Sequence, residues 1–174
     1  MREINGDLFS HNEHGPSAIC ITTNGFVNSQ GSNTMGAGCA LRAKVLWPGI
    51  QLTLGKAVRD GGNHVHLLTE VAPNIADEGY TLQLPNWGLY PPHPVPYHVV
   101  SFPTKNHWKE NSDLALIKQS AAELLGLATK QGWTSVVVPR PGCGLGNLDW
   151  DRTVRPLLVS LWDDRFFVID FKKE

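Results

Sequence analysis

Residues 135–147 read SVVVPRPGCGLGN, and this stretch decides the fold class. The run from Ser135 to Val138 is β-branched and apolar, which predicts a strand buried on both faces. It leads into a glycine-rich loop, Pro139 to Asn147, and a helical pattern follows from Asp149 to Trp162, with Asp149 or Asn147 as its start. A strand that passes through a loop into a helix is typical of an α/β domain.

The same order of elements occurs earlier in the chain. Ala18 to Thr23 (AICITT) predicts a second buried strand, and Cys39 to Trp47 (CALRAKVLW) predicts a helix. Between them lies a second loop rich in Gly, Asn and Ser, from Asn24 to Gly38. Two glycine-rich loops are therefore expected where a strand gives way to a helix.

The remaining elements continue the alternation of strands and helices. Ser112 to Lys130 has helical spacing, with Asn111 or Ser112 as a cap and Gly132 at its end. Further strands are expected at Ile4 to Phe9, His64 to Val71, Tyr97 to Phe102 and Arg165 to Phe171, and a further helix at Ile50 to Asp60. This order predicts one α/β domain over residues 1–174, with a mixed, largely parallel sheet covered on both faces.

One segment interrupts this order. Residues 73–96 contain six prolines, which excludes a central strand or helix there. We expect a surface excursion with one short hairpin around Tyr80 to Leu84.

Composition narrows the class of protein. The chain has 174 residues, of which 41% are hydrophobic and 18% charged, with a net charge of -1. That balance argues against disorder and against strong affinity for duplex DNA, which depends on many Lys and Arg contacts to phosphate. Three cysteines predict reduced thiols, and the first ten residues, MREINGDLFS, do not resemble a signal peptide. We expect a soluble, cytoplasmic protein that does not enter a membrane.

The two glycine-rich loops are the candidate ligand site. In open α/β sheets, ligands bind beyond the carboxyl ends of the strands, where glycine lets backbone N–H groups approach an oxyanion. Two such loops at one edge could hold a diphosphate, although the glycines could also serve only to form turns. The chain contains no P-loop motif, because Gly55-Lys56, the Gly-Lys pair, is followed by Ala57. The dinucleotide-binding fingerprint does not fit either, because the third glycine after Gly36-Ala37-Gly38 is missing.

Four segments together resemble the macro domain family. They are Asn5 to Phe9 (NGDLF), Asn24 to Lys44 with its MGAGCAL core, Ser101 to Trp108 (SFPTKNHW) and Val138 to Trp150 (VPRPGCGLGNLDW). The third segment is similar to one branch, which contains the antitoxin-type DNA ADP-ribosylglycohydrolases and the terminal ADP-ribose protein glycohydrolase. The resemblance implies a three-layer α/β/α fold with an ADP-ribose cleft at the carboxyl edge of the sheet.

The resemblance also implies roles for individual residues. Asp7 matches the aspartate that binds adenine, and Asn24 matches the asparagine that faces the distal ribose, although each could instead be an ordinary loop residue. The other positions that match ligand-binding segments are Leu8, Met35, Gly36, Ala37, Gly38, Cys39, Pro103, Thr104, Gly142, Cys143, Gly144, Leu145, Gly146 and Asn147. Phe171 is one candidate to stack on adenine.

Lys105 matches the lysine that this branch uses for catalysis. Its amine could attack the anomeric carbon of ring-opened ADP-ribose or stabilise the leaving group. We expect Trp108 and Phe102 to exclude water and His107 to be a neighbour. Alternatively, Lys105 is a surface lysine without a catalytic role.

One position departs from the protein-directed enzyme of this branch. That enzyme has an aspartate in the second loop, where this chain has Gly146. Glycines in that loop followed by Leu148-Asp149-Trp150 resemble the DNA-directed enzymes more closely. The departure leaves a lysine–aspartate pair in doubt.

Two other kinds of site receive little support. His64, His66, His93, His98 and His107 are irregularly spaced, so no metal site and no cofactor are expected. Cys143 could be a nucleophile at a helix start, but a small residue in a phosphate-binding loop is the simpler interpretation.

The sequence therefore predicts a domain that binds ADP-ribose or an ADP-ribosylated macromolecule, either DNA or protein. The favoured activity is an ADP-ribosylhydrolase that removes ADP-ribose from a nucleic-acid base or an acidic side chain. A non-catalytic ADP-ribose reader and an ADP-ribose 1''-phosphate phosphatase are the alternatives.

Overall fold

The computed structural model describes residues 1–9, 16–71 and 96–170. Most of the proline-rich excursion expected at 73–96, with its hairpin around Tyr80 to Leu84, lies outside the described residues. His93 and Phe171 lie outside them too. In the part of the chain that is described, no helix has the length and apolar character needed to cross a membrane.

Six strands and five helical segments alternate along the described chain. In chain order they are β1 (Arg2–Asn5), β2 (Ala18–Asn24), α1 (Gly38–Leu46), α2 (Ile50–Gly61), β3 (Leu67–Val71), β4 (Tyr97–Lys105), α3 (Leu114–Gln131), β5 (Val136–Pro139), the π-helical turn η1 (Trp150–Val154), α4 (Arg155–Val159) and β6 (Phe166–Asp170). Each expected strand and helix is present, with shifts at some ends.

The strands form a single mixed sheet in the order β1-β6-β5-β2-β4-β3. Every neighbouring pair is parallel except β3 and β4, which are antiparallel. The central strand β2 has β4 on one side and β5 on the other. The prediction of a mixed, largely parallel sheet is confirmed.

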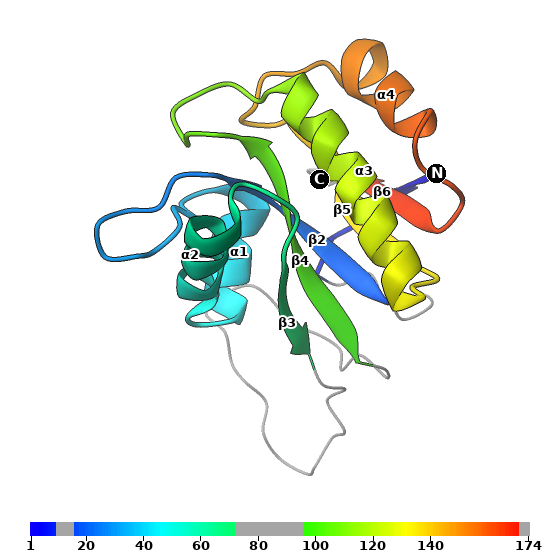
Figure 1. The fold of residues 1–174 in the computed structure, drawn as a ribbon. Coiled ribbons are helices and arrows are strands. Elements are labelled where there is room, and N and C mark those ends of the chain that lie inside the picture. The colour runs from blue at the N-terminus through cyan, green and yellow to red at the C-terminus, as the bar shows by residue number, and fades with distance from the viewer. Residues whose placement is uncertain (10–15, 72–95, 171–174) are drawn as a thin grey trace.

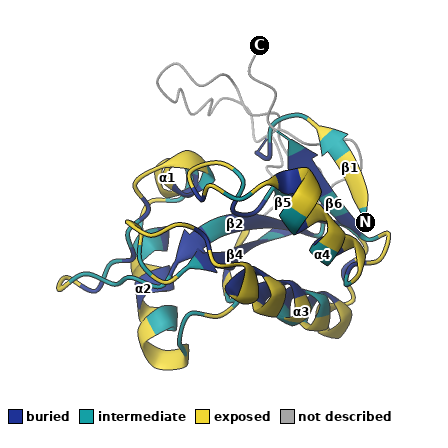
Figure 2. Ribbon diagram, turned by 90° about the horizontal axis from the view of Figure 1, so that it is seen from above, coloured by how far each residue is buried: buried dark blue, intermediate teal, exposed yellow. Residues whose placement is uncertain are grey.

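Helices cover both faces of the sheet, with α1 and α2 on one face and α3 and α4 on the other (Figure 1). Alternate residues of β2 serve the two cores: Ala18 and Cys20 pack towards α3, whereas Ile19 and Ile21 pack towards α1 and α2. Because both faces are covered, β2, β4 and β5 are mostly buried, as Figure 2 shows in dark blue. This explains the nearly continuous apolar runs and confirms the three-layer α/β/α architecture.

The start of α3 differs from the expectation. The N-cap is Asp113, whose carboxylate accepts hydrogen bonds from Ala115 N at 2.8 Å and Leu116 N at 3.4 Å. The predicted caps, Asn111 and Ser112, are therefore wrong by one or two residues. Gly132 ends the helix in a left-handed conformation, and Asp149 caps the next helical segment through Arg152 N, both as expected.

Several strands also have different ends. β1 spans Arg2–Asn5 and not Ile4 to Phe9, since its pairing with β6 covers Arg2 to Asn5. β3 begins at Leu67 and not at His64. His66 O still accepts from Ser101 N at 2.9 Å, but the N–H groups of Val65 and His66 donate to side chains and not to the backbone of β4. β4 continues past Phe102 to Lys105, since β2 pairs with it along that length.

The cap of α3 gives a direct test. Asp113→Ala should lower the free energy of unfolding by about 1 kcal/mol, because two N–H groups of the first turn lose their acceptor. Ser112→Ala should have almost no effect or stabilise slightly, since Ser112 Oγ is buried without a hydrogen-bond partner among the described residues. Urea denaturation followed by circular dichroism measures both changes. A larger loss for Ser112→Ala would show that the cap is misassigned.

Candidate functional site

The carboxyl ends of β2, β4 and β5 lie side by side at one edge of the sheet. They end at Asn24, Lys105 and Pro139. The first glycine-rich loop leaves β2 and the second leaves β5, so both emerge at this edge, beside the end of β4. The structure thus brings together the segments that the sequence singled out.

The first loop is held by two asparagine side chains. Asn24 Nδ2 donates to Thr34 O at 2.8 Å, and Asn24 Oδ1 accepts from Phe26 N at 3.0 Å. Asn33 Nδ2 donates to Asn24 O at 2.7 Å from a buried position. The amide of Asn24 therefore shapes its own loop in this structure, and its contact with a ribose stays a prediction.

The end of this loop exposes a helix N-terminus. Met35 is buried and anchors the chain, whereas Gly36, Ala37 and Gly38 are exposed. Ala37 is the N-cap of α1 and makes no side-chain capping bond. The first N–H groups of α1 thus lack a side-chain cap, and such groups, with the helix dipole, favour an anion.

Cys39 lies in the first turn of α1. Its Sγ is 3.1 Å from Thr22 Oγ1 on β2. Burial raises the pKa of the Cys39 thiol. Cys39 therefore fastens the start of α1 to the sheet as a thiol.

The second loop is a compact turn from Arg140 to Leu148. Leu148 N donates to Gly142 O at 3.0 Å, and Asn147 N donates to Gly144 O at 3.3 Å. Gly144 and Leu145 are exposed at its tip. Burial raises the pKa of Cys143 to about 11, which keeps it a thiol and argues against a nucleophilic role.

Gly146 explains the departure noted in the sequence. A Cβ built on Gly146 would overlap Ser112 Oγ and would lie 2.5 Å from Gly142 O. Ser112 N also donates to Gly146 O at 2.9 Å, so the two segments are tied together at this point. An aspartate does not fit at position 146 unless this contact opens.

Lys105 touches both loops. Its Nζ donates to Leu145 O in the second loop at 3.3 Å. Its carbonyl accepts from Gly25 N in the first loop at 3.1 Å and from Asn63 Nδ2 at 3.2 Å. The backbone of Lys105 is therefore bonded to the first loop, and its amine is bonded to the second loop.

Pro103 and Thr104 hold the end of β4 in place. Both are buried, and their carbonyls accept from Ser120 Oγ and Asp113 N, each at 2.8 Å. Thr104 Oγ1 donates to Thr23 O at 3.3 Å. Direct contact of these two residues with a ligand stays a prediction.

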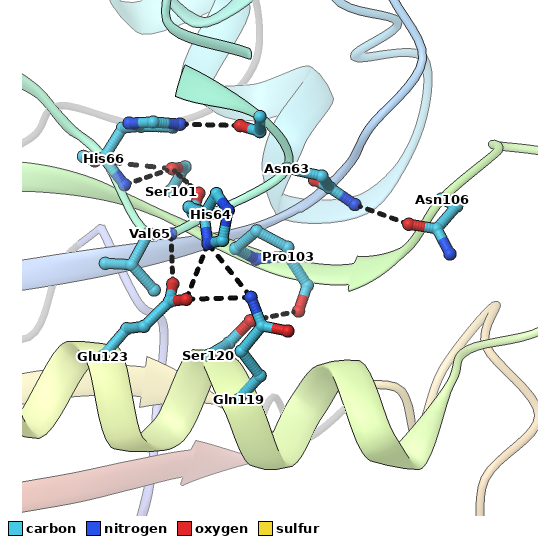
Figure 3. A network of polar contacts seen from close by, with 11 residues as sticks. Asn63, His64, Val65, His66, Ser101, Pro103, Asn106, Gln119, Ser120 and Glu123 are labelled. Atoms are coloured by element: carbon cyan, nitrogen blue, oxygen red, sulfur yellow. Dashed lines mark hydrogen bonds and ion pairs between the residues drawn. The ribbon is translucent and has the colours of Figure 1, made fainter.

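A strap, defined as residues 62–66, lies against the part of β4 that extends beyond β3 (Figure 3). His66 N donates to Ser101 Oγ at 2.8 Å, and Val65 N donates to Glu123 Oε2 at 2.9 Å. Asn63 Nδ2 reaches Asn106 Oδ1 at 3.0 Å as well as the carbonyl of Lys105. The strap thus links α2 to α3 and to the residues around Lys105.

Glu123 is the anchor of the strap on α3. Burial alone would raise its pKa, but hydrogen bonds from Val65 N, His64 and Gln119 outweigh this effect and hold the pKa below its usual value. His64 Nδ1 lies 2.6 Å from Glu123 Oε1. The sequence did not predict that Glu123 binds residues 64 and 65, because the alternating pattern of His64 to Leu68 predicts a strand there.

Asp7 is bonded to α1 through Arg42. Its two carboxylate oxygens accept from Nη1 and Nη2 of Arg42, each at 2.7 Å, and Oδ1 also accepts from Phe9 N at 3.1 Å. The Arg42 guanidinium lies 4.7 Å from the centre of the Phe9 ring, and Leu8 is buried. Sequence reasoning missed Arg42, because nothing in the pattern of α1 links it to a residue 35 positions earlier.

Phe102 lies away from the candidate site. Phe102 is fully buried in the core on the α3 face, where its ring lies 6.0 Å from that of Trp162. The expectation that it excludes water from the site is therefore wrong. Among the described residues, no group of three His, Cys, Asp or Glu is placed to hold a metal ion.

The contact at Gly146 gives a second test. Gly146→Ala should destabilise the protein by about 1–3 kcal/mol, because the added methyl group must displace Ser112 or the turn. Gly144→Ala in the same loop is the matched control, since a Cβ there meets nothing within 4 Å. Thermal unfolding of both variants measures the difference. Equal stability of the two would show that Gly146 is not constrained by packing.

Comparison with known proteins is consistent with this geometry. The family model described as Macro domain matches residues 91–157. The DNA ADP-ribosyl glycohydrolase of Mycobacterium tuberculosis is 42% identical over 65 residues, which are 37% of this chain and 18% of that protein. The chain thus aligns with less than a fifth of the length of the curated relatives it matches.

Solved structures extend the likeness to the whole chain. The macrodomain of Mycobacterium tuberculosis DarG has a TM-score of 0.69 and 28% identity, covering 99% of this chain and 97% of that one. Thermosipho africanus DarTG in complex with ADP-ribose has a TM-score of 0.69 and 22% identity, covering 98% and 42%. The chain thus has the fold of these macrodomains, and residues 91–157 match the macro domain family model.

Proposed function

We propose that this chain is a macro domain that binds ADP-ribose along the carboxyl edge of the sheet and hydrolyses the bond that joins ADP-ribose to a DNA base. The observation that carries the proposal is the position of Lys105, whose amine contacts the second loop while its carbonyl is bonded to the first. The similarity to proteins named DNA ADP-ribosyl glycohydrolase supports the choice of substrate.

Backbone N–H groups would bind the diphosphate. Those at the start of α1, around Gly36, Ala37, Gly38 and Cys39, lack a side-chain cap. In the second loop, which the amine of Lys105 contacts at Leu145 O, the candidate donors are the N–H groups of Gly142, Gly144, Leu145 and Gly146, because those of Cys143 and Asn147 are bonded within the loop. Two sets of N–H donors suit a ligand with two phosphates, because backbone donors can bind the phosphates without many cationic side chains.

The ends of the ligand would then meet different side chains. Asp7, paired with Arg42 of α1, would accept from the adenine amino group. Asn24 and Leu145 flank Lys105 and would lie near the distal ribose. This direction places the bond to be cleaved next to the amine of Lys105.

Lys105 would act on the anomeric carbon of the distal ribose. Its neutral amine forms a C–N bond as the bond to the leaving base breaks, and the base departs with a proton. The ribose ring then opens as the remaining N–H proton passes to the ring oxygen, so that the adduct becomes a Schiff base. Water then adds to the lysine adduct, which releases ADP-ribose and restores the amine. Since a carboxylate does not fit at Gly146, this chain would not use a lysine–aspartate pair there.

A reader without turnover is the second candidate. It is favoured by one observation: Lys105 makes no ion pair with a carboxylate in residues 1–9, 16–71 and 96–170. Calorimetric binding of ADP-ribose without release from modified DNA would identify such a reader.

The lysine mechanism is tested by substitution at Lys105. Lys105→Ala should lower the rate of ADP-ribose release from modified DNA by at least about 100-fold while ADP-ribose still binds. Lys105→Arg should be equally inactive, because guanidinium keeps the charge but does not act as a nucleophile. Lys118→Ala, an exposed lysine on α3, is the matched control and should retain full activity.

Borohydride reduction during turnover adds a direct measurement. It should join ADP-ribose covalently to the wild-type protein and not to Lys105→Arg, as seen by mass spectrometry. Full activity of Lys105→Arg, or labelling of both proteins, would refute the nucleophilic role of Lys105.

A further inference from the structure

Three aromatic rings follow one another beside Lys105. We call Phe26, His107 and Trp108 the aromatic row. The ring centres of Phe26 and His107 are 4.7 Å apart in an edge-on contact, and those of His107 and Trp108 are 5.5 Å apart and stacked. Phe26 comes from the first glycine-rich loop and the other two from the segment after Lys105, so the row joins two parts of the candidate site.

The row is not explained by the core. Trp108 is 46% exposed, whereas Trp133, Trp150 and Trp162 are 4–6% exposed. No member of the row belongs to either of the two core clusters. An exposed indole stacked on a second ring is a large apolar surface that a structural role alone does not require.

Hydrogen bonds hold two members of the row, Phe26 and His107, in place. His107 Nδ1 accepts from Lys109 N at 3.2 Å, and His107 N donates to Glu110 Oε2 at 3.1 Å. Phe26 N is bonded to Asn24 Oδ1 at 3.0 Å. A preorganised platform loses little conformational entropy when a flat ligand binds to it.

Charge around the row favours an anionic partner. Lys109 Nζ lies 5.0 Å from the centre of the Trp108 ring, and Lys105 lies two residues before His107. The neighbouring carboxylates of Glu110 and Asp113 accept hydrogen bonds from backbone N–H groups. Aromatic faces with adjacent lysines are the usual means of binding a nucleobase and its phosphate.

We infer that the aromatic row is a docking site for an unpaired nucleobase next to the modified nucleotide, with Trp108 as the ring on which that base stacks. This inference rests on the proposed function, because the macromolecule is attached at the anomeric carbon beside Lys105. In a duplex the neighbouring base is stacked between its own neighbours and does not present a face. The small net charge, -1, also suits one or two stacked bases better than a duplex.

Binding to the Lys105→Ala variant tests the inference without turnover. The probes are a single-stranded oligonucleotide with one ADP-ribosylated base, the corresponding ADP-ribosylated nucleoside, a peptide ADP-ribosylated on glutamate, and free ADP-ribose. Adding Trp108→Ala should weaken binding of the oligonucleotide by roughly 5- to 100-fold, the range expected for one stacked base. Affinity for the other three probes should not change.

Two further variants serve as controls. Trp108→Phe keeps an aromatic face and should restore most of the affinity for the oligonucleotide. Val159→Ala removes an apolar side chain on α4 that is 51% exposed, and it should change nothing.

The outcomes separate this inference from the proposed function. If free ADP-ribose does not bind to the Lys105→Ala variant, the proposed function fails and the inference fails with it. If ADP-ribose binds but Trp108→Ala leaves oligonucleotide affinity intact, or weakens nucleoside binding equally, the inference alone is refuted. An equal loss with the peptide would also refute it, because the row would then serve a protein substrate.

Discussion

Because β2 pairs in parallel with both of its neighbours, β4 and β5, the carboxyl ends of these three strands lie at the same edge of the sheet. Each of these strands leads into a polar or glycine-rich segment. Pairing of the strands is therefore enough to bring these segments to the same edge. The shift in register between Thr23 and Asn24 sets Asn24 opposite Lys105. Strand pairing therefore places the backbone of Lys105 beside the first loop, and its side chain reaches the second loop at Leu145 O.

The end of β4 needs further support because β3 does not accompany it. Side chains take over the role of a strand partner: Asn63 binds the carbonyl of Lys105, and Ser120 binds that of Pro103. The strap brings Asn63 to this place and is itself anchored on Glu123. Glu123 on α3 is thus connected through the strap to the backbone of Lys105, the candidate catalytic residue.

Sequence patterns were sufficient for the elements and the loops, because burial on both faces produces long apolar runs and glycine marks the turns. They failed where side chains replace backbone partners. His64 to Val71 alternates as a strand does, yet its first residues bond to Ser101 and Glu123. The choice of Asp113 over Ser112 as a cap depended on backbone geometry, and the pairing of Asp7 with Arg42 depended on the tertiary fold.

The central claim is that backbone N–H groups of the two glycine-rich loops bind the diphosphate of ADP-ribose. Titration of ¹⁵N-labelled protein with ADP-ribose, followed by amide chemical shifts, tests it most directly. The account predicts that the largest saturable shifts occur in residues 36–39 and 142–147. Saturable binding that leaves both sets of amides unchanged would contradict it.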